Sequence, residues 1–268
     1  MTSSLTDHVW LSEKRTNLLL LLMEGPRDIE QIKVSLNVTS RGMMPQIKKL
    51  KEKHLIVEEN DHYRLSNIGE LIVKNMLPLI NTLSMINENK EYWEQHDINI
   101  LPPHLFKRLH ELGNYLLLEP DLHYTFEIPK EFTENLLKSR EIKSIISFYR
   151  PEYPKFYSEL AEKADSLTLI LSKAAFERMK SNRMKELDFL LSAENTQVLL
   201  YEGEARPPAI DVSEWFMYIS FFNENGSYDH NDIMSFDESA LTWCSELFDH
   251  YLEQSVEIKD IDETREAQ

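Results

Sequence analysis

This sequence of 268 residues lacks most features that mark secreted and membrane-spanning proteins. Its single cysteine, Cys244, cannot form an internal disulfide, which suits a reducing cytoplasm. The apolar run Leu18–Met23 has six residues, far fewer than the roughly 20 that cross a bilayer. No basic segment followed by an apolar stretch and a cleavage site opens the chain, so no secretory signal is expected. We therefore expect a cytoplasmic protein without a membrane span.

Catalytic signatures are also missing. The six glycines do not form a phosphate-binding loop, and no two of the nine histidines have the spacing of a metalloprotease helix. No histidine stands two residues before a lysine, as the phospholipase D motif requires. A single cysteine cannot supply the ligands of a zinc ribbon. We expect no enzyme and no cofactor. The cluster Asp229–Asp232 could hold a cation, although an ordinary polar loop is the better explanation of these residues. Cys244 is expected to be a small buried residue rather than a redox sensor.

The acidic charge is unevenly distributed. The formal net charge is −17, from 29 Lys plus Arg and 46 Asp plus Glu, which by itself disfavours nucleic acid as a partner. Residues 1–66 carry 10 basic and 9 acidic side chains, a net +1, and residues 67–268 carry 19 and 37, a net −18. The segment Arg41–Lys53 alone has five basic residues and one acidic residue, a local +4. Such asymmetry suggests different partners for the two parts.

The N-terminal part predicts three helices and a hairpin. Ser12 and Asp28 are expected to cap the first two helices, and Gly25-Pro26 ends the first. Ser40 is expected to cap a third helix that runs to about Lys53. Pro45 lies inside it, so we expect a distorted first turn or a regular helix that starts nearer Met44. Two short extended runs around an Asn-Asp turn follow, at 55–58 and 62–65, and predict a β-hairpin.

Three helices and a hairpin are the order of elements in a winged helix-turn-helix. The third helix would lie in the major groove of double-stranded DNA, and the hairpin would reach the neighbouring backbone or minor groove. Arg41 and Gln46 could make bidentate contacts with bases. The predicted DNA-binding residues are Ser40, Arg41, Gln46, Lys48, Lys49, Lys51, Lys53, His62 and Arg64. The alternative is a winged helix that contacts protein, with these side chains solvated.

A long amphipathic helix is predicted from Ser66-Asn67 onward. Its apolar residues recur at intervals of three and four: Ile68, Leu71, Ile72, Met76, Leu79, Ile80, Leu83 and Ile86. This stripe exceeds what a sixty-residue module can cover, so it is expected to pack against the second domain, a partner subunit, or both. The polar stretch 87–91 is the expected break between domains.

Two groups of motifs carry a resemblance to a known family. The run 91–98 contains Trp93 and the pair His96-Asp97, and a Pro-led helix over 102–113 ends at Leu112-Gly113. Near the other end are 225–230, 235–237 and a helix with Trp243, Leu247, Phe248 and Tyr251. These features resemble archaeal winged-helix regulators with a methanogenesis regulatory domain of the Fil type. The resemblance is diffuse, covers nearly the whole chain, and departs from the family at Asn99-Ile100, where a glycine is expected. It implies a DNA-binding regulator with a C-terminal sensing or dimerising domain.

The C-terminal part alternates strand and helix patterns, which predicts an α/β layered domain. Strands are predicted at 123–128, 142–148, 166–171, 197–201, 215–222 and 233–236, and helices at 130–138, 153–164, 174–179, 184–192 and 238–254. A hairpin turn is predicted over 222–228, with antiparallel edge strands on either side. The domains expected are a winged helix-turn-helix with its trailing helix (1–87), a helical connector (88–121), the α/β regulatory or sensor domain (122–258) and an acidic tail (259–268).

Cationic and hydroxyl side chains follow three of the predicted strands. In an open α/β sheet small molecules bind beyond the carboxyl ends of the strands, so a small anionic effector is a candidate ligand. The residues concerned are Ser147, Tyr149, Arg150, Lys173, Tyr201 and Arg206, although strand ends are polar in any soluble protein. The fold class expected overall is α+β or α/β, and the function expected is a homodimeric, DNA-binding transcriptional regulator. The alternatives are an α/β enzyme with an appended helical module and an adaptor whose winged helix contacts protein only.

Overall fold

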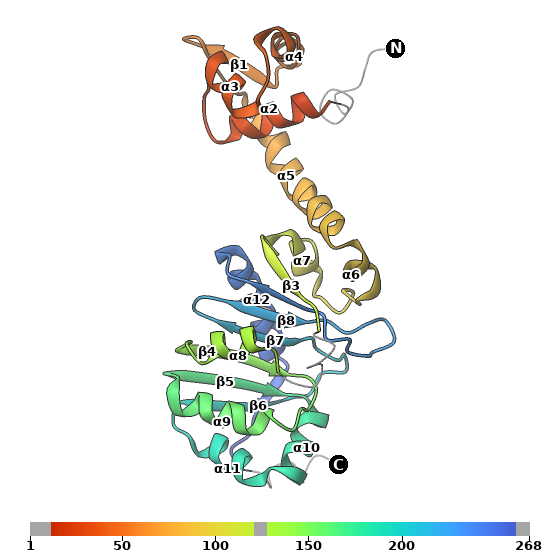
Figure 1. Cartoon of the computed structure of the whole chain (residues 1–268), viewed down its shortest axis with the longest axis vertical. Coiled ribbons are helices and arrows are strands. Elements are labelled where there is room, and N and C mark those ends of the chain that lie inside the picture. The colour runs from red at the N-terminus through yellow and green to blue at the C-terminus, as the bar shows by residue number, and fades with distance from the viewer. Residues whose placement is uncertain (1–11, 121–127, 261–268) are drawn as a thin grey trace. The chain divides into compact units, whose positions relative to one another are not determined.

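The computed structural model describes residues 12–120 and 128–260 (Figure 1). The chain divides into two compact units, the first ending at Ser84 and the second beginning at Met85. Each has its own hydrophobic core and is described by itself. Within the described residues, no helix is long and apolar enough to cross a membrane.

The first unit consists of three helices followed by an antiparallel hairpin, in the predicted order. The helices are α2 (Glu13–Met23), α3 (Ile29–Leu36) and α4 (Ser40–Glu52), and β1 (Ile56–Glu59) pairs with β2 (His62–Leu65). The apolar sides of the three helices pack together in the core. Helix α2 contributes Leu18, Leu19, Leu21 and Leu22, α3 contributes Ile32, and α4 contributes Met43, Ile47 and Leu50. Burial of these faces orients α4 so that its other side points outward.

Side-chain caps fix the starts of two of these helices. Asp28 forms a full capping box with Gln31, in which each side chain accepts a hydrogen bond from the other residue's backbone N–H. The cap predicted for α4 is wrong by one residue, because Thr39 Oγ1 accepts from the Gly42 N–H and Ser40 is already helical. Of the two alternatives expected for Pro45, a helix that starts near Met44 is wrong, since α4 begins at Ser40 and passes through Pro45, whose nitrogen has no hydrogen to donate.

A single residue pair joins the loop before α3 to the hairpin. Arg27 pairs with Tyr63 in an isolated antiparallel bridge, with backbone N···O distances of 3.0 and 2.8 Å. The loop before α3 is thereby joined to the hairpin after α4. One residue is too short a run for the sequence pattern to reveal as a strand.

Helix α5 (Asn67–Glu88) has 22 residues and buries Val73 and Met76 in the core of the first unit. It ends before Asn89, and α6 (Lys90–Gln95) begins at once, so a break between helices lies within 87–91. The predicted boundary between domains at 87–91 does not coincide with the division of the two compact units, which lies between Ser84 and Met85. Residues 88–121, predicted as a connector, include Trp93, Leu105 and Leu112, which pack in a core of the second unit.

The second unit is a large mixed sheet with helices on both faces. Before the segment 121–127 lie α6, α7 (Pro103–Phe106), the 3₁₀ helix η1 (Leu109–Leu112) and β3 (Tyr115–Leu118). The remaining elements are α8 (Lys130–Leu136), β4 (Glu141–Ile146), α9 (Tyr153–Lys163), β5 (Ser166–Leu171), α10 (Lys173–Asn182), α11 (Met184–Ser192), β6 (Thr196–Tyr201), β7 (Ala209–Ser213), β8 (Met217–Ser220), β9 (Asp232–Ser235), α12 (Glu238–Leu252) and β10 (Ser255–Glu257).

The strand order of the sheet is β10-β6-β5-β4-β7-β8-β9-β3. Strands β4, β5 and β6 run parallel to one another, and every other neighbouring pair is antiparallel. The two patterns meet at β4, where Ser144 lies opposite Asp211 of β7. The expected α/β or α+β fold class is confirmed.

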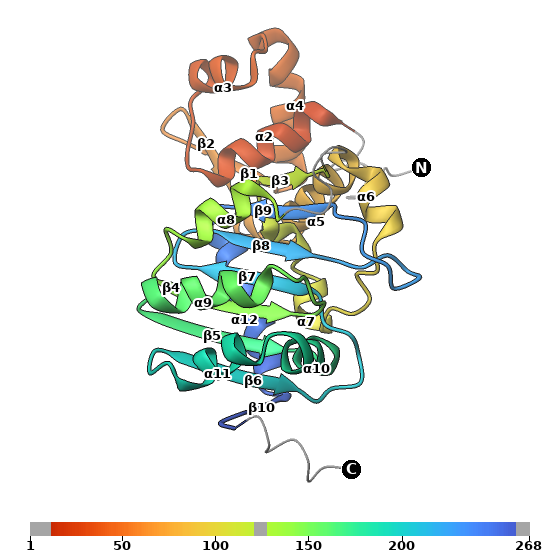
Figure 2. The same ribbon diagram turned by 60° about the horizontal axis from the view of Figure 1, so that its bottom comes forward.

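The two faces of the sheet bury different helices (Figure 2). Ile145, Ile170 and Leu199 pack on one side with α12, α6, α7 and η1. Their neighbours Ile146, Leu169 and Val198 pack on the other side with α8, α9, α10 and α11. Because alternate residues of a strand face opposite sides, the parallel strands are nearly continuous apolar runs.

Most predicted elements of this unit are present. Strand β5 and helix α11 have the predicted bounds, and the other predicted elements within the described residues differ by a few residues at their ends. The predicted strand 123–128 falls almost entirely outside the described residues. The edge position predicted for β8 and β9 is wrong, because β3 and β10, which were not predicted, form the edges.

Candidate functional site

The outward side of α4 carries exposed cations. Its buried side is formed by Met43, Ile47 and Leu50. Arg41 and Lys48 are seven residues apart, so they share the opposite side of the helix, and Lys49 lies beside them. All three are exposed, and within the described residues none has a carboxylate at ion-pair distance. Their charge is therefore available to an external anion.

Three other predicted DNA-binding residues form ion pairs or hydrogen bonds with neighbouring side chains. Lys51 Nζ lies 2.5 Å from Glu58 Oε2, and Arg64 Nη2 lies 2.5 Å from Glu59 Oε1. Arg15 of α2, almost fully buried, donates a hydrogen bond of 2.9 Å to Gln46 Oε1. These contacts hold Lys51 against the hairpin, hold Arg64 of β2 against Glu59 of β1, and fasten α4 to α2 through the Gln46 amide.

The remaining three predicted residues lie at the margins of this surface. Ser40 is the first residue of α4, and Lys53 follows its last turn. His62 begins β2, and its Nδ1 lies 2.9 Å from the Asn60 carbonyl oxygen in the hairpin turn. The surface with the least internal neutralisation is thus formed by Arg41, Lys48 and Lys49; we call these three residues the α4 cationic face.

The six predicted ligand residues of the second unit do not form one group. Ser147 Oγ donates a hydrogen bond of 2.9 Å to the Pro208 carbonyl, and Tyr149 packs on the core that contains α9. Lys173 is exposed at the start of α10, and Tyr201 is buried in the core that contains α12. The prediction placed these side chains together because they follow strands, but it had no information about the face of the sheet on which each side chain lies.

Arg150 and Arg206 do converge, on the connection between β8 and β9. Arg150 Nη2 lies 2.9 Å from His230 Nδ1, and its guanidinium lies 5.7 Å from the Tyr228 ring centroid. Arg206 donates to the Gly226 carbonyl at 2.8 Å and stacks on Phe222 at 3.6 Å. Two cations from different segments therefore border one loop.

Two buried carboxylates of this unit were not predicted as site residues. Burial raises the pKa of Asp211 to about 7, against the opposing effect of hydrogen bonds from Ser144 and Tyr157. Burial likewise raises the pKa of Asp232, which accepts hydrogen bonds from Tyr218 and Tyr228. An aspartate inside an apolar strand is the signal that could have revealed Asp211.

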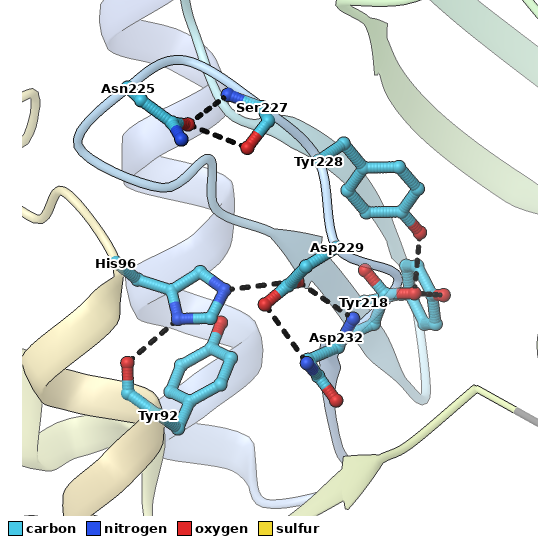
Figure 3. Close-up of polar contacts among 9 residues, drawn as sticks. Tyr92, His96, Tyr218, Asn225, Ser227, Tyr228, Asp229 and Asp232 are labelled. Carbon is cyan, nitrogen blue, oxygen red and sulfur yellow. Dashed lines mark hydrogen bonds and ion pairs between the residues drawn. The ribbon is translucent and has the colours of Figure 1, made fainter.

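The motifs that suggested a family contact one another (Figure 3). His96 Nδ1 lies 2.7 Å from the Tyr92 carbonyl oxygen, and its Nε2 lies 3.2 Å from Asp229 Oδ1. Asp229 is also held by Asn231, and Asp232 by Tyr218 and Tyr228, so 229–231 form a structured loop that leads into the first residue of β9. Among the described residues no group of three or more His, Cys, Asp or Glu side chains is arranged to hold a metal ion.

Comparisons with known proteins agree with these motifs. Two sequence models built for the methanogenesis regulatory protein FilR1 match the chain, that of its N-terminal domain over residues 8–84 and that of its middle domain over residues 125–254. The chain is also 26% identical over 259 residues to the methanogenesis regulatory protein FilR1 of Methanothrix harundinacea (strain 6Ac). In these two regions the chain is similar to FilR1. Both matched families are regulatory proteins rather than enzymes, which agrees with the expectation of a non-enzymatic protein.

The match to the curated FilR1 is partial in length. It covers 95% of this chain but only 58% of that protein. Two solved structures overlap more loosely, at a level that does not establish a shared fold. TrmBL2, an archaeal chromatin protein, has a TM-score of 0.43 at 11% identity, covering 95% of this chain and 100% of that chain. Nuc, a phospholipase D family member from Salmonella typhimurium, has a TM-score of 0.41 at 7% identity, covering 55% of this chain and 100% of that chain.

Proposed function

We propose that this chain is a cytoplasmic, homodimeric transcriptional regulator that binds double-stranded DNA through α4 and the hairpin. In this proposal the first unit acts as a winged helix-turn-helix, and the second unit senses a small anion or mediates association. The relationship to a methanogenesis regulatory protein supports regulation as the role. The observation that carries the DNA part is the α4 cationic face, Arg41, Lys48 and Lys49, which is exposed and has no carboxylate at ion-pair distance among residues 12–120 and 128–260, on a chain of net charge −17.

The distribution of charge fits this proposal. Phosphates attract the α4 cationic face, whereas the acidic residues of the second unit repel DNA that is not bound at α4. Since Lys51 and Arg64 are paired with glutamates, each copy offers few free cations. One copy would therefore bind weakly, and two copies on half-sites about one helical turn apart would supply enough contacts.

Binding of promoter DNA from the native host, measured by fluorescence anisotropy over a range of salt concentrations, tests the proposal. We expect the affinity of the full chain to fall steeply with salt and to be abolished by Lys48→Glu with Lys49→Glu. The matched control is Lys155→Glu with Lys185→Glu, the same charge change on exposed residues of α9 and α11. Unaltered binding by the α4 variant would refute the role of α4, and no binding at low salt would favour the adaptor.

The effector part of the proposal rests on Arg150 and Arg206. Both border the loop that connects β8 with β9, and two guanidinium groups can share an anion through bidentate hydrogen bonds. The other four predicted ligand residues would contribute to the orientation of this loop or to solubility rather than to anion binding. They are Ser147, Tyr149, Lys173 and Tyr201.

Inorganic phosphate and a dicarboxylate such as succinate are suitable first probes. We expect at least one of them to raise the melting temperature of the wild-type chain, because a ligand bound only to the folded state stabilises it. Arg206→Gln should abolish the increase, whereas Lys173→Gln should retain it. Equal increases in all three proteins would show a general salt effect and would remove Arg206 from the effector site.

A further inference from the structure

Helix α5 exposes more large apolar side chains than any other described element. Of the fourteen exposed large hydrophobic residues within the described part of the chain, five lie on this helix. Their exposed fractions are 54% for Ile68, 64% for Leu71, 49% for Leu79, 49% for Leu83 and 36% for Ile86. A single exposed leucine has no significance, but a contiguous row of them indicates an interaction surface.

These five residues form one stripe along the helix. At 100° per residue they fall within an arc of roughly 120°, and the helix is about 33 Å long. Val73 and Met76, which pack in the core of the first unit, lie beside this arc. Glu70 and Lys74, paired at 2.7 Å, lie on the opposite side. The stripe itself contains no charged residue, so an apolar partner is required to cover it.

Asn75 lies in this stripe and indicates what the partner is. Its Nδ2 donates a hydrogen bond of 2.8 Å to the Leu71 carbonyl of its own helix. A lone asparagine in an apolar helical seam is best satisfied by the same amide of an identical helix, because an amide offers both a donor and an acceptor. An anionic lipid surface is a poor alternative, since the polar side of such a helix is rich in Lys and Arg, and Lys74, the single cation of α5, is paired.

We infer that α5 is the dimerisation helix, and that it packs in parallel against α5 of a second copy of this chain through Ile68, Leu71, Asn75, Leu79, Leu83 and Ile86. The parallel orientation rests on the proposed function, because it keeps both α4 helices at the same end of the pair, where one duplex can contact them. Pairing of the stripe with itself also explains why its exposed leucines persist on an otherwise acidic chain.

Cysteine cross-linking of the full chain tests this arrangement residue by residue. The native Cys244 is fully buried and its pKa is raised by that burial, so it does not compete for an added oxidant. In a parallel pair, each stripe position lies close to its own copy across the interface. Leu71→Cys, Asn75→Cys and Leu83→Cys should therefore each give a covalent dimer on a non-reducing gel.

The matched control is Asn81→Cys, an exposed residue on the opposite side of α5, which should remain monomeric on the gel. Equal cross-linking at position 81 would indicate random collision and overturn the inference. Cross-linking at position 75 alone would indicate an antiparallel pair and overturn the parallel arrangement. Absence of cross-links at all stripe positions would show that another surface covers it, either the second unit of the same chain or a different protein.

Sedimentation equilibrium gives an independent measure. The wild-type chain should be a dimer, Leu79→Glu with Leu83→Glu should be a monomer with unchanged helical content by circular dichroism, and Asn81→Glu should remain a dimer. A monomeric wild type, or a dimeric Leu79→Glu and Leu83→Glu variant, contradicts the inference. A dimer that fails to bind DNA would instead leave this interface in place and refute the proposed function.

Discussion

His96 Nε2 and Asp229 Oδ1, 133 residues apart in the sequence, lie 3.2 Å from each other in the second unit. The second ring nitrogen of His96 faces the Tyr92 carbonyl oxygen at 2.7 Å. Each ring nitrogen of His96 thus lies within hydrogen-bond distance of an oxygen atom. The His96 ring also stacks on Tyr92, with ring centroids 3.9 Å apart.

This contact between His96 and Asp229 is expected to fasten the end of α6 to the connection between β8 and β9. His96→Gln loses the ring contact with Asp229 and the stacking on Tyr92, and because the His96 side chain is fully buried we expect a loss of about 2 kcal/mol in the free energy of unfolding. Urea unfolding of His96→Gln, Asp229→Asn and the double variant would measure it. Strictly additive losses would show that the two side chains do not interact.

Gly113 and Asp237 provide a second long-range test. Gly113 has φ +63°, and a Cβ at this position would stand 2.3 Å from Asp237 Oδ2. Gly113→Ala should therefore destabilise the second unit by about 2 kcal/mol or more. Gly226→Ala is the control, since Gly226 has a similar φ of +77° but open space around it. If thermal unfolding shows equal losses in the two variants, backbone strain alone is responsible and the contact with Asp237 is irrelevant.

Asp211 should make stability depend on pH. Burial raises the pKa of this carboxyl to about 7, whereas in the unfolded chain it has the ordinary value near 4. Between these values the folded state binds more protons than the unfolded state, so this carboxyl makes stability fall as pH rises from about 4 to 7, by at most about 1.4 kcal/mol per pH unit. Above about 7 its contribution is constant.

Asp211→Asn isolates this effect, because the amide oxygen can still accept from Ser144 and Tyr157. We expect chemical unfolding of this variant to show a weaker fall in stability across pH 4 to 7 than the wild type. Identical pH profiles for the two proteins would mean that the buried carboxyl does not titrate in this range.

Release of Arg64 from its glutamate should strengthen DNA binding. Glu59 holds the Arg64 guanidinium at 2.5 Å, and this pair lowers the pKa of Glu59 through the hydrogen bond and the charge of Arg64. Glu59→Gln removes that charge, so Arg64 becomes available to a phosphate, and we expect several-fold tighter binding at low salt. Glu30→Gln, which frees Lys33 on α3, serves as the control. Equal gains from both would reflect net charge alone.

Local patterns were sufficient to predict much of the fold. The apolar spacing of Met43, Ile47 and Leu50 placed the third helix, and the continuous apolar runs placed β5 and β6. Prediction failed where structure depends on distant partners. Strand β10 has three residues and pairs with β6, and β7 contains Asp211 because Ser144 and Tyr157 donate to it from β4 and α9.

The same limit applies to the candidate sites. The sequence placed the cations of α4 correctly on a helix, but it could not show that Glu58 and Glu59 would neutralise Lys51 and Arg64, because these contacts depend on how the hairpin folds back. The family motifs were visible at both ends of the second unit. Their contact through His96 and Asp229 was not, because periodicity carries no information on pairing across 133 residues.

DNA binding through unneutralised cations of α4 is the central claim, and the salt dependence of two single variants tests it most directly. Lys48 has no carboxylate partner among the described residues, whereas Lys51 is paired with Glu58. Lys48→Gln should weaken binding and reduce the slope of log affinity against log salt by about one, the value for one lost phosphate contact, and Lys51→Gln should change the slope little. Equal slopes for Lys48→Gln and the wild type would contradict the account.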